Sequence, residues 1–136
     1  MRALHRRWIV AAVVALAAVA AAGTLGAGWI SKQQQSERVA RAMTGGDPAK
    51  APDLIRRYGC SGCHTISGIP GGDGQVGGPL SDLKKRVYVG GVAQNSPDNL
   101  VRWIVDPQSF SPRSAMPRSG ISEGEARDVA AYLYSN

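Results

Sequence analysis

The chain has 136 residues, with 16 basic and 10 acidic side chains, which suits one small domain and a further segment. Its net charge of +6 is concentrated in the first part of the chain, because residues 1–50 carry seven basic and two acidic side chains. No basic stripe with interleaved aromatic side chains is present, which argues against a nucleic-acid-binding protein.

Residues 8–30 contain no charged side chain and have a tryptophan near each end, Trp8 and Trp29. About 20 apolar residues span a bilayer, so this stretch predicts a single-pass transmembrane anchor. The basic segment 1–7 would stay in the cytoplasm, which places the rest of the chain on the periplasmic side of a bacterial inner membrane. A cleaved signal peptide, with an alanine-rich cleavage site at Ala20–Ala22, is the alternative.

Residues 31–51 are polar and lack a sustained apolar period, which predicts a partly helical linker. The run from Gly45 to Pro48 (Gly-Gly-Asp-Pro) predicts that this linker ends in a flexible segment. Residues 52–136 then form a separate domain with few large aliphatic side chains. A domain this small needs additional stabilisation, and a large flat cofactor would supply the missing apolar core.

The chemistry is concentrated in the pentapeptide Cys60-Ser61-Gly62-Cys63-His64, which holds both cysteines of the chain. C-x-x-C-H is typical of haem attachment, because two thiols one turn apart add to two vinyl groups and the histidine reaches the iron. A disulfide or a thioredoxin-like redox pair is the main alternative, but the strand pattern of a thioredoxin is missing. A zinc site would need a fourth ligand, and the other histidine, His5, lies before the predicted anchor. The motif therefore predicts one covalent haem c with His64 on its iron.

Met116 is the candidate for the second iron ligand. Met1 starts the chain and Met43 lies in the predicted linker, whereas Met116 precedes Pro117 in a loop. A thioether favours ferrous iron and so raises the reduction potential. A core-filling role is the alternative. If both axial positions are filled, the protein binds no small-molecule substrate at iron and acts as an electron carrier rather than an enzyme.

Three helices are predicted in residues 52–136. The first follows Pro52 and leads into the cysteines, and the second begins at the N-cap Ser96 and ends before Pro107. The third begins at a capping box formed by Ser122 and Glu125. Helices separated by long glycine- and proline-rich loops predict a small all-α domain wrapped around a ligand.

Residues 52–136 resemble the class I cytochromes c, and especially the cytochrome c domains associated with haem–copper oxidases and periplasmic dehydrogenase systems. The matching stretches are Tyr58–Thr65, Gly78–Leu80, Asn99–Gln108, Ala115–Pro117 and Asp128–Leu133. The resemblance implies the cytochrome c fold around one haem. The 136 residues are expected to be too few to hold the copper-binding barrel of such an oxidase subunit as well.

The resemblance also implies roles for four further residues. The Pro79 carbonyl would accept the Nδ1 proton of His64. Trp103, Tyr88 and Arg86 would hydrogen-bond a haem propionate, with plain core packing as the alternative for Trp103.

For function, the resemblance implies single-electron transfer to a terminal oxidase from a bc1-type complex or a quinol-oxidising dehydrogenase. A haem subunit of a periplasmic dehydrogenase and a haem gas sensor are the alternatives. A basic rim would dock onto acidic redox partners, or would be an ordinary solvated face; it consists of Lys84, Lys85, Arg86, Arg113 and Arg118.

Overall fold

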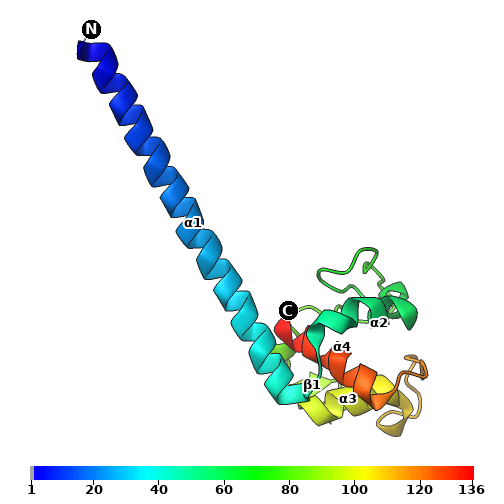
Figure 1. Cartoon of the computed structure of the whole chain (residues 1–136). Helices are drawn as coiled ribbons and strands as arrows, with labels where there is room; N and C mark the ends of the chain where they lie inside the picture. The colour runs from blue at the N-terminus through cyan, green and yellow to red at the C-terminus, as the bar shows by residue number, and fades with distance from the viewer. Residues whose placement is uncertain (1) are drawn as a thin grey trace. The chain divides into compact units, whose positions relative to one another are not determined.

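The computed structural model describes the backbone of residues 2–136 and the side chains of residues 6–136 (Figure 1). Met1 and the side chains of residues 2–5, which belong to the predicted cytoplasmic segment, lie outside the described residues. The chain divides into two compact units, one ending at Gln35 and one spanning Ser36–Asn136. The elements in chain order are α1 (Arg2–Thr44), η1 (Pro48–Lys50), α2 (Ala51–Arg57), η2 (Cys60–Gly62), η3 (Leu83–Lys85), β1 (Tyr88–Val89), β2 (Ala93–Gln94), α3 (Pro97–Val105), η4 (Pro107–Ser109) and α4 (Glu123–Ser135).

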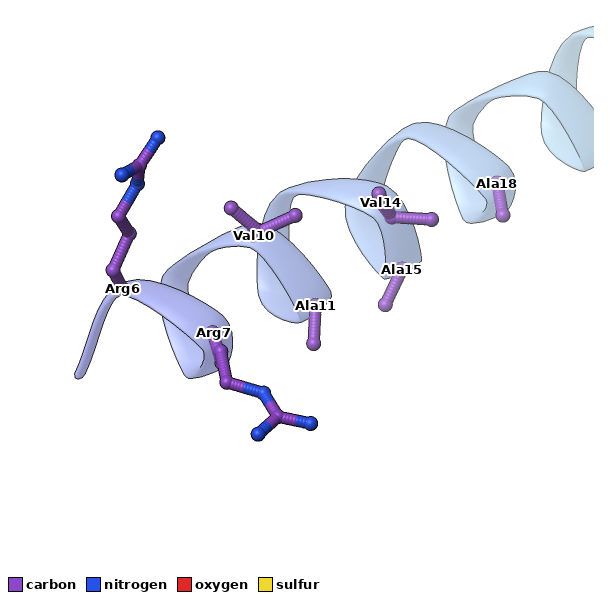
Figure 2. Close-up of a pocket in the computed structure, with 7 residues that line it drawn as sticks. All are labelled: Arg6, Arg7, Val10, Ala11, Val14, Ala15 and Ala18. Atoms are coloured by element: carbon purple, nitrogen blue, oxygen red, sulfur yellow. The ribbon is translucent and has the colours of Figure 1, made fainter. Parts of the chain in front are cut away.

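The first unit is the amino-terminal part of α1. Within it, Trp8 and Trp29 are both more than two-thirds exposed, and none of the apolar window of the helix is buried. By length and composition this helix could cross a membrane. Figure 2 shows the charged side chains of Arg6 and Arg7 in the first turns of α1, followed by the apolar side chains of valine and alanine residues. All these side chains come from one helix, so the open surface along them is not an enclosed ligand site.

The second unit begins with the last turns of α1, which pack onto the domain. Ala40 and Thr44 are buried, and the Thr44 hydroxyl donates to the Ala40 carbonyl at 2.8 Å. The backbone N–H of Asp47 donates to the carboxylate of Asp128 in α4 at 2.6 Å. At Gly46 a Cβ would collide with the backbone of α4. The prediction of a flexible Gly-Gly-Asp-Pro segment is therefore wrong: its glycine permits close packing instead of motion.

The core of the second unit lies where α4 meets α2 and α3, which Figure 1 shows on either side of it. Ala126 and Ala130 of α4 are fully buried, and their small side chains let the neighbouring helices approach closely. The predicted caps are confirmed, since the Ser96 hydroxyl accepts from Asn99 N and the Ser122–Glu125 capping box forms in both directions. These caps start α3 and α4 where the sequence predicts.

Long loops fill the space between the helices, and regular strand structure in the described chain is limited to one short antiparallel pair. Tyr88 pairs with Gln94 and Val89 with Ala93, and the turn between them uses Gly90 and Gly91, both with positive φ. The predicted all-α architecture is confirmed. The loops from His64 to Ser96 and from Val105 to Ser122 enclose the site described next.

Candidate haem site

The two cysteines and His64 lie on one tight turn directly after α2. Gly59 ends the helix with φ +70°, a left-handed conformation that favours glycine. The N–H groups of Cys63 and His64 both donate to the Cys60 carbonyl, at 3.2 and 3.0 Å. These two hydrogen bonds fold the backbone of Cys60, Cys63 and His64 into one turn. Cys60 and Cys63 are not joined to each other by a disulfide.

His64 is oriented by a backbone carbonyl. Its Nδ1 lies 2.7 Å from the carbonyl oxygen of Gly78. A carbonyl oxygen only accepts, so Nδ1 carries the proton and Nε2 keeps the lone pair that binds a metal. The prediction that Pro79 supplies this carbonyl is wrong by one residue. The Pro79 carbonyl points elsewhere and accepts from the Arg86 guanidinium.

Close packing by Gly77 also restrains the His64 ring. A Cβ at Gly77 would fall on the imidazole ring, so glycine is required there. The Gly77 N–H donates to the Cys63 carbonyl at 2.7 Å, which keeps this backbone against the cysteine turn. The sequence contains Gly77 and Gly78 as part of a glycine-rich loop, but nothing in the pattern singles out these two.

The imidazole faces a cavity of about 450 Å³ with mostly apolar walls. A smaller cavity of about 130 Å³ adjoins it and shares Cys60, His64 and Met116 as lining residues. Of the predicted site residues, those lining one or both cavities are Cys60, Cys63, His64, Arg86, Tyr88, Trp103 and Met116. Pro79 does not line either of them. Residues far apart in the sequence are thus gathered around one apolar space.

Arg86, Tyr88 and Trp103 form one edge of the larger cavity. The Arg86 guanidinium donates to the carbonyls of Pro79 and Ser81. Tyr88 is 59% exposed, so it lies at the rim and not in the core. Trp103 is partly buried, and its indole lies where a Cβ at Gly90 would be, which requires glycine at that turn.

The loop that carries Met116 is held by polar residues that the sequence analysis did not select. Gln108 of η4 donates from Nε2 to the Met116 carbonyl at 2.7 Å. Ser114 accepts the Met116 N–H on its hydroxyl at 3.2 Å. Gln108 stands directly after the Pro107 that ends α3, and a polar side chain so close to a predicted ligand loop is the signal that could have marked it.

The donor set fits haem c. Two thiols, an imidazole with a free Nε2 and a thioether surround an apolar cavity of the size of a large planar cofactor. The sequence matches the cytochrome c family over residues 49–136. The chain belongs to the cytochrome c family. It is therefore an electron-transfer haem protein, and its cofactor is covalently bound haem c with iron.

Curated relatives of this cytochrome c include two proteins named cytochrome c oxidase subunit 2. The one from Alkalihalophilus pseudofirmus is 36% identical over 60% of this chain and 23% of its own length. The one from Bacillus sp. strain PS3 is 28% identical over 79% of this chain and 30% of its own length. The chain thus spans less than a third of these relatives. No solved structure is significantly similar to it.

Proposed function

We propose that this chain is a membrane-anchored, single-haem cytochrome c that passes single electrons to a terminal oxidase. The donor would be a bc1-type complex or a quinol-oxidising dehydrogenase. The observation that carries the proposal is the pairing of His64 and Met116 around one cavity in a chain whose relatives are named oxidase subunits.

In this proposal Cys60 and Cys63 would hold the cofactor through thioether bonds, and His64 and Met116 would ligate its iron. The bound haem supplies a one-electron ferric/ferrous couple. His64 is kept in the Nε2-ligating tautomer by the Gly78 carbonyl. The apolar walls exclude water, and Met116 favours the reduced state. Because His64 and Met116 would both bind the iron, the protein would act as a carrier without a catalytic step of its own.

Arg86, Tyr88 and Trp103 are proposed to orient the propionate edge of the haem. All three line the larger cavity. Arg86 keeps further N–H groups beyond the two that contact backbone carbonyls, because a guanidinium has five donors. A charged donor at the rim would stabilise a propionate while leaving the haem edge open for electron transfer.

The proposed location is the bacterial inner membrane, with residues 8–30 as the anchor and the haem domain in the periplasm. The uncharged, exposed face of α1 and the arginines before it support this orientation. The leader alternative has a direct test. Amino-terminal sequencing of the native protein should begin at or near residue 1, whereas a start after Ala22 would mean that the segment is removed.

The proposed docking face is the basic rim. Two of its five members already pair with acidic residues, Lys85 with Asp82 and Arg118 with Asp106. Because Arg86 is proposed to face a propionate, the remaining positive charge is carried mainly by Lys84 and Arg113. Exposed charges of this kind raise association rates with acidic partners at low salt more than they raise affinity.

The function is tested by reconstitution of the full-length protein in liposomes with a haem–copper oxidase from the same membranes. Reduced protein should drive cyanide-sensitive oxygen consumption that saturates with protein concentration. The Met116→Ala variant, with a lower potential and an opened iron, should drive it poorly and bind carbon monoxide. Wild-type protein that binds carbon monoxide at neutral pH and reduces no oxidase would contradict the proposal.

A further inference from the structure

The loop from Asp106 to Arg118 carries Met116 and is closed at its base by an ion pair. Arg118 donates from Nε and Nη2 to the two carboxylate oxygens of Asp106, at 2.7 and 2.5 Å. Asp106 also accepts the Ser109 N–H and so caps η4. The two ends of the loop are therefore joined to each other, and η4 is fixed to the same carboxylate.

Inside this loop, side chains hold the backbone of Met116. Its N–H donates to the Ser114 hydroxyl and its carbonyl accepts from Gln108 Nε2. The same Gln108 nitrogen lies 3.3 Å from the Ser114 carbonyl. Both hydrogen bonds of the Met116 backbone are thus bonds to side chains. Among the described residues, the backbone of Met116 makes no hydrogen bond to another backbone group. The position of Met116 thus depends on two side chains rather than on a helix or a sheet.

The orientation of the Gln108 amide follows from its surroundings. Its nitrogen faces two carbonyl oxygens, so turning the amide over would place an oxygen against both acceptors. Its Oε1 is buried and has no partner within the described part of the chain. A buried acceptor without a partner costs free energy. The hydrogen bonds donated by Nε2 to the Ser114 and Met116 carbonyls must offset this cost and so keep the Gln108 side chain in place.

We propose that Gln108, together with Ser114, is the positioning residue of Met116 and holds its thioether within bonding distance of the iron. This inference rests on the proposed role of Met116 as a ligand. A neutral thioether is a weak ligand, so water or an added imidazole replaces it when the loop moves away. We call the two hydrogen bonds that join Gln108 and Ser114 to the Met116 backbone the clamp. The clamp restricts the motion of the loop before the iron binds, and so favours the bond between sulfur and iron.

Two variants of the full-length holoprotein test the clamp. Gln108→Met has a similar length but no donor, and Ser114→Ala loses only the hydroxyl. Each should weaken the far-red sulfur-to-iron charge-transfer band of the ferric form and raise its affinity for imidazole. For Gln108→Met we expect about a tenfold increase, the size of one net hydrogen bond. Ser114→Ala should give a smaller increase.

Matched substitutions control for unspecific loosening. Gln94→Met changes an exposed glutamine on β2, and Ser111→Ala changes a serine of the same loop whose hydroxyl bonds to no described residue. Both should keep wild-type spectra and imidazole affinity. If Gln108→Met yields too little holoprotein, Ser114→Ala alone decides in the same assay.

The outcomes separate the two proposals. A wild-type protein without the charge-transfer band shows that Met116 is not the ligand, which removes the basis of the clamp. A wild-type protein with the band, but with Gln108→Met and Ser114→Ala unchanged in band and imidazole affinity, overturns the clamp and leaves the ligand assignment standing. A loss of unfolding stability alone, with unchanged spectra, also overturns it.

Discussion

Replacing Gly77 by alanine is the sharpest test of the site geometry. The added methyl group would overlap the imidazole of His64 at three ring atoms, Cε1, Nδ1 and Nε2. The backbone cannot withdraw easily, since Gly77 N–H is bonded to the Cys63 carbonyl and the next carbonyl, of Gly78, is bonded to His64. The ring therefore has to rotate or shift.

The expected cost has two parts. Forcing an extra methyl group into packed surroundings costs about 1–3 kcal/mol. Loss of the 2.7 Å contact between His64 Nδ1 and the Gly78 carbonyl costs about 1 kcal/mol more. The sum of about 2–4 kcal/mol is a large share of the stability of about 5–15 kcal/mol that small domains have. Because the carbonyl also makes the imidazole a stronger donor to iron, its loss should raise the reduction potential.

The measurements are haem content from the alkaline pyridine spectrum, guanidinium unfolding of the holoprotein and the midpoint potential. Gly124→Ala is the matched control, because a Cβ there meets no atom within 4 Å and alanine favours a helix. That control should be as stable as the wild type or slightly more so. If Gly77→Ala also matches the wild type in stability and potential, the described packing around His64 is wrong.

Three further predictions address other parts of the structure. Asp128→Ala removes the acceptor of Asp47 N–H and should cost about 2 kcal/mol in chemical unfolding; an unchanged midpoint would mean that residues 36–50 do not pack on α4. The Arg118 guanidinium lowers the pKa of Asp106 from its usual 3.8, so the pair stabilises the fold above that pH and its contribution fades as the pH falls through the lower folded-state pKa. The stability difference between wild type and Asp106→Asn should accordingly shrink below pH 3.8 in acid titrations, and a constant difference would contradict this. Cys60→Ala should leave a single thioether and shift the alkaline pyridine band to longer wavelength, whereas an unshifted band would speak against attachment at Cys60.

The helices of the second unit could be predicted because their signals are local. Ser96 and the Ser122–Glu125 capping box satisfy the first N–H groups of α3 and α4 wherever the rest of the chain goes. The flexible Gly-Gly-Asp-Pro segment was predicted wrongly for the opposite reason. Nothing local shows that Asp128, 81 residues further on, supplies the acceptor that fixes Asp47.

The site divides in the same way. Cys60, Cys63 and His64 are adjacent in the sequence, so their chemistry is visible in five residues. The acceptor for His64 was misplaced by one residue, because the direction of a carbonyl depends on the backbone path through the loop. Gln108 was missed because its role depends on a hydrogen bond to Met116, which lies eight positions further on in an irregular loop.

By itself, the sequence determined the haem-binding class of the protein, the helix starts and an apolar segment long enough to span a bilayer, since attachment chemistry, capping and hydropathy all act over a few neighbouring residues. Only the tertiary structure decided which carbonyl orients His64, which glycine gives it room and which side chains hold Met116. These depend on contacts between segments that meet only when the chain closes around the cavity, and a one-residue change in a loop path redirects every backbone group in it.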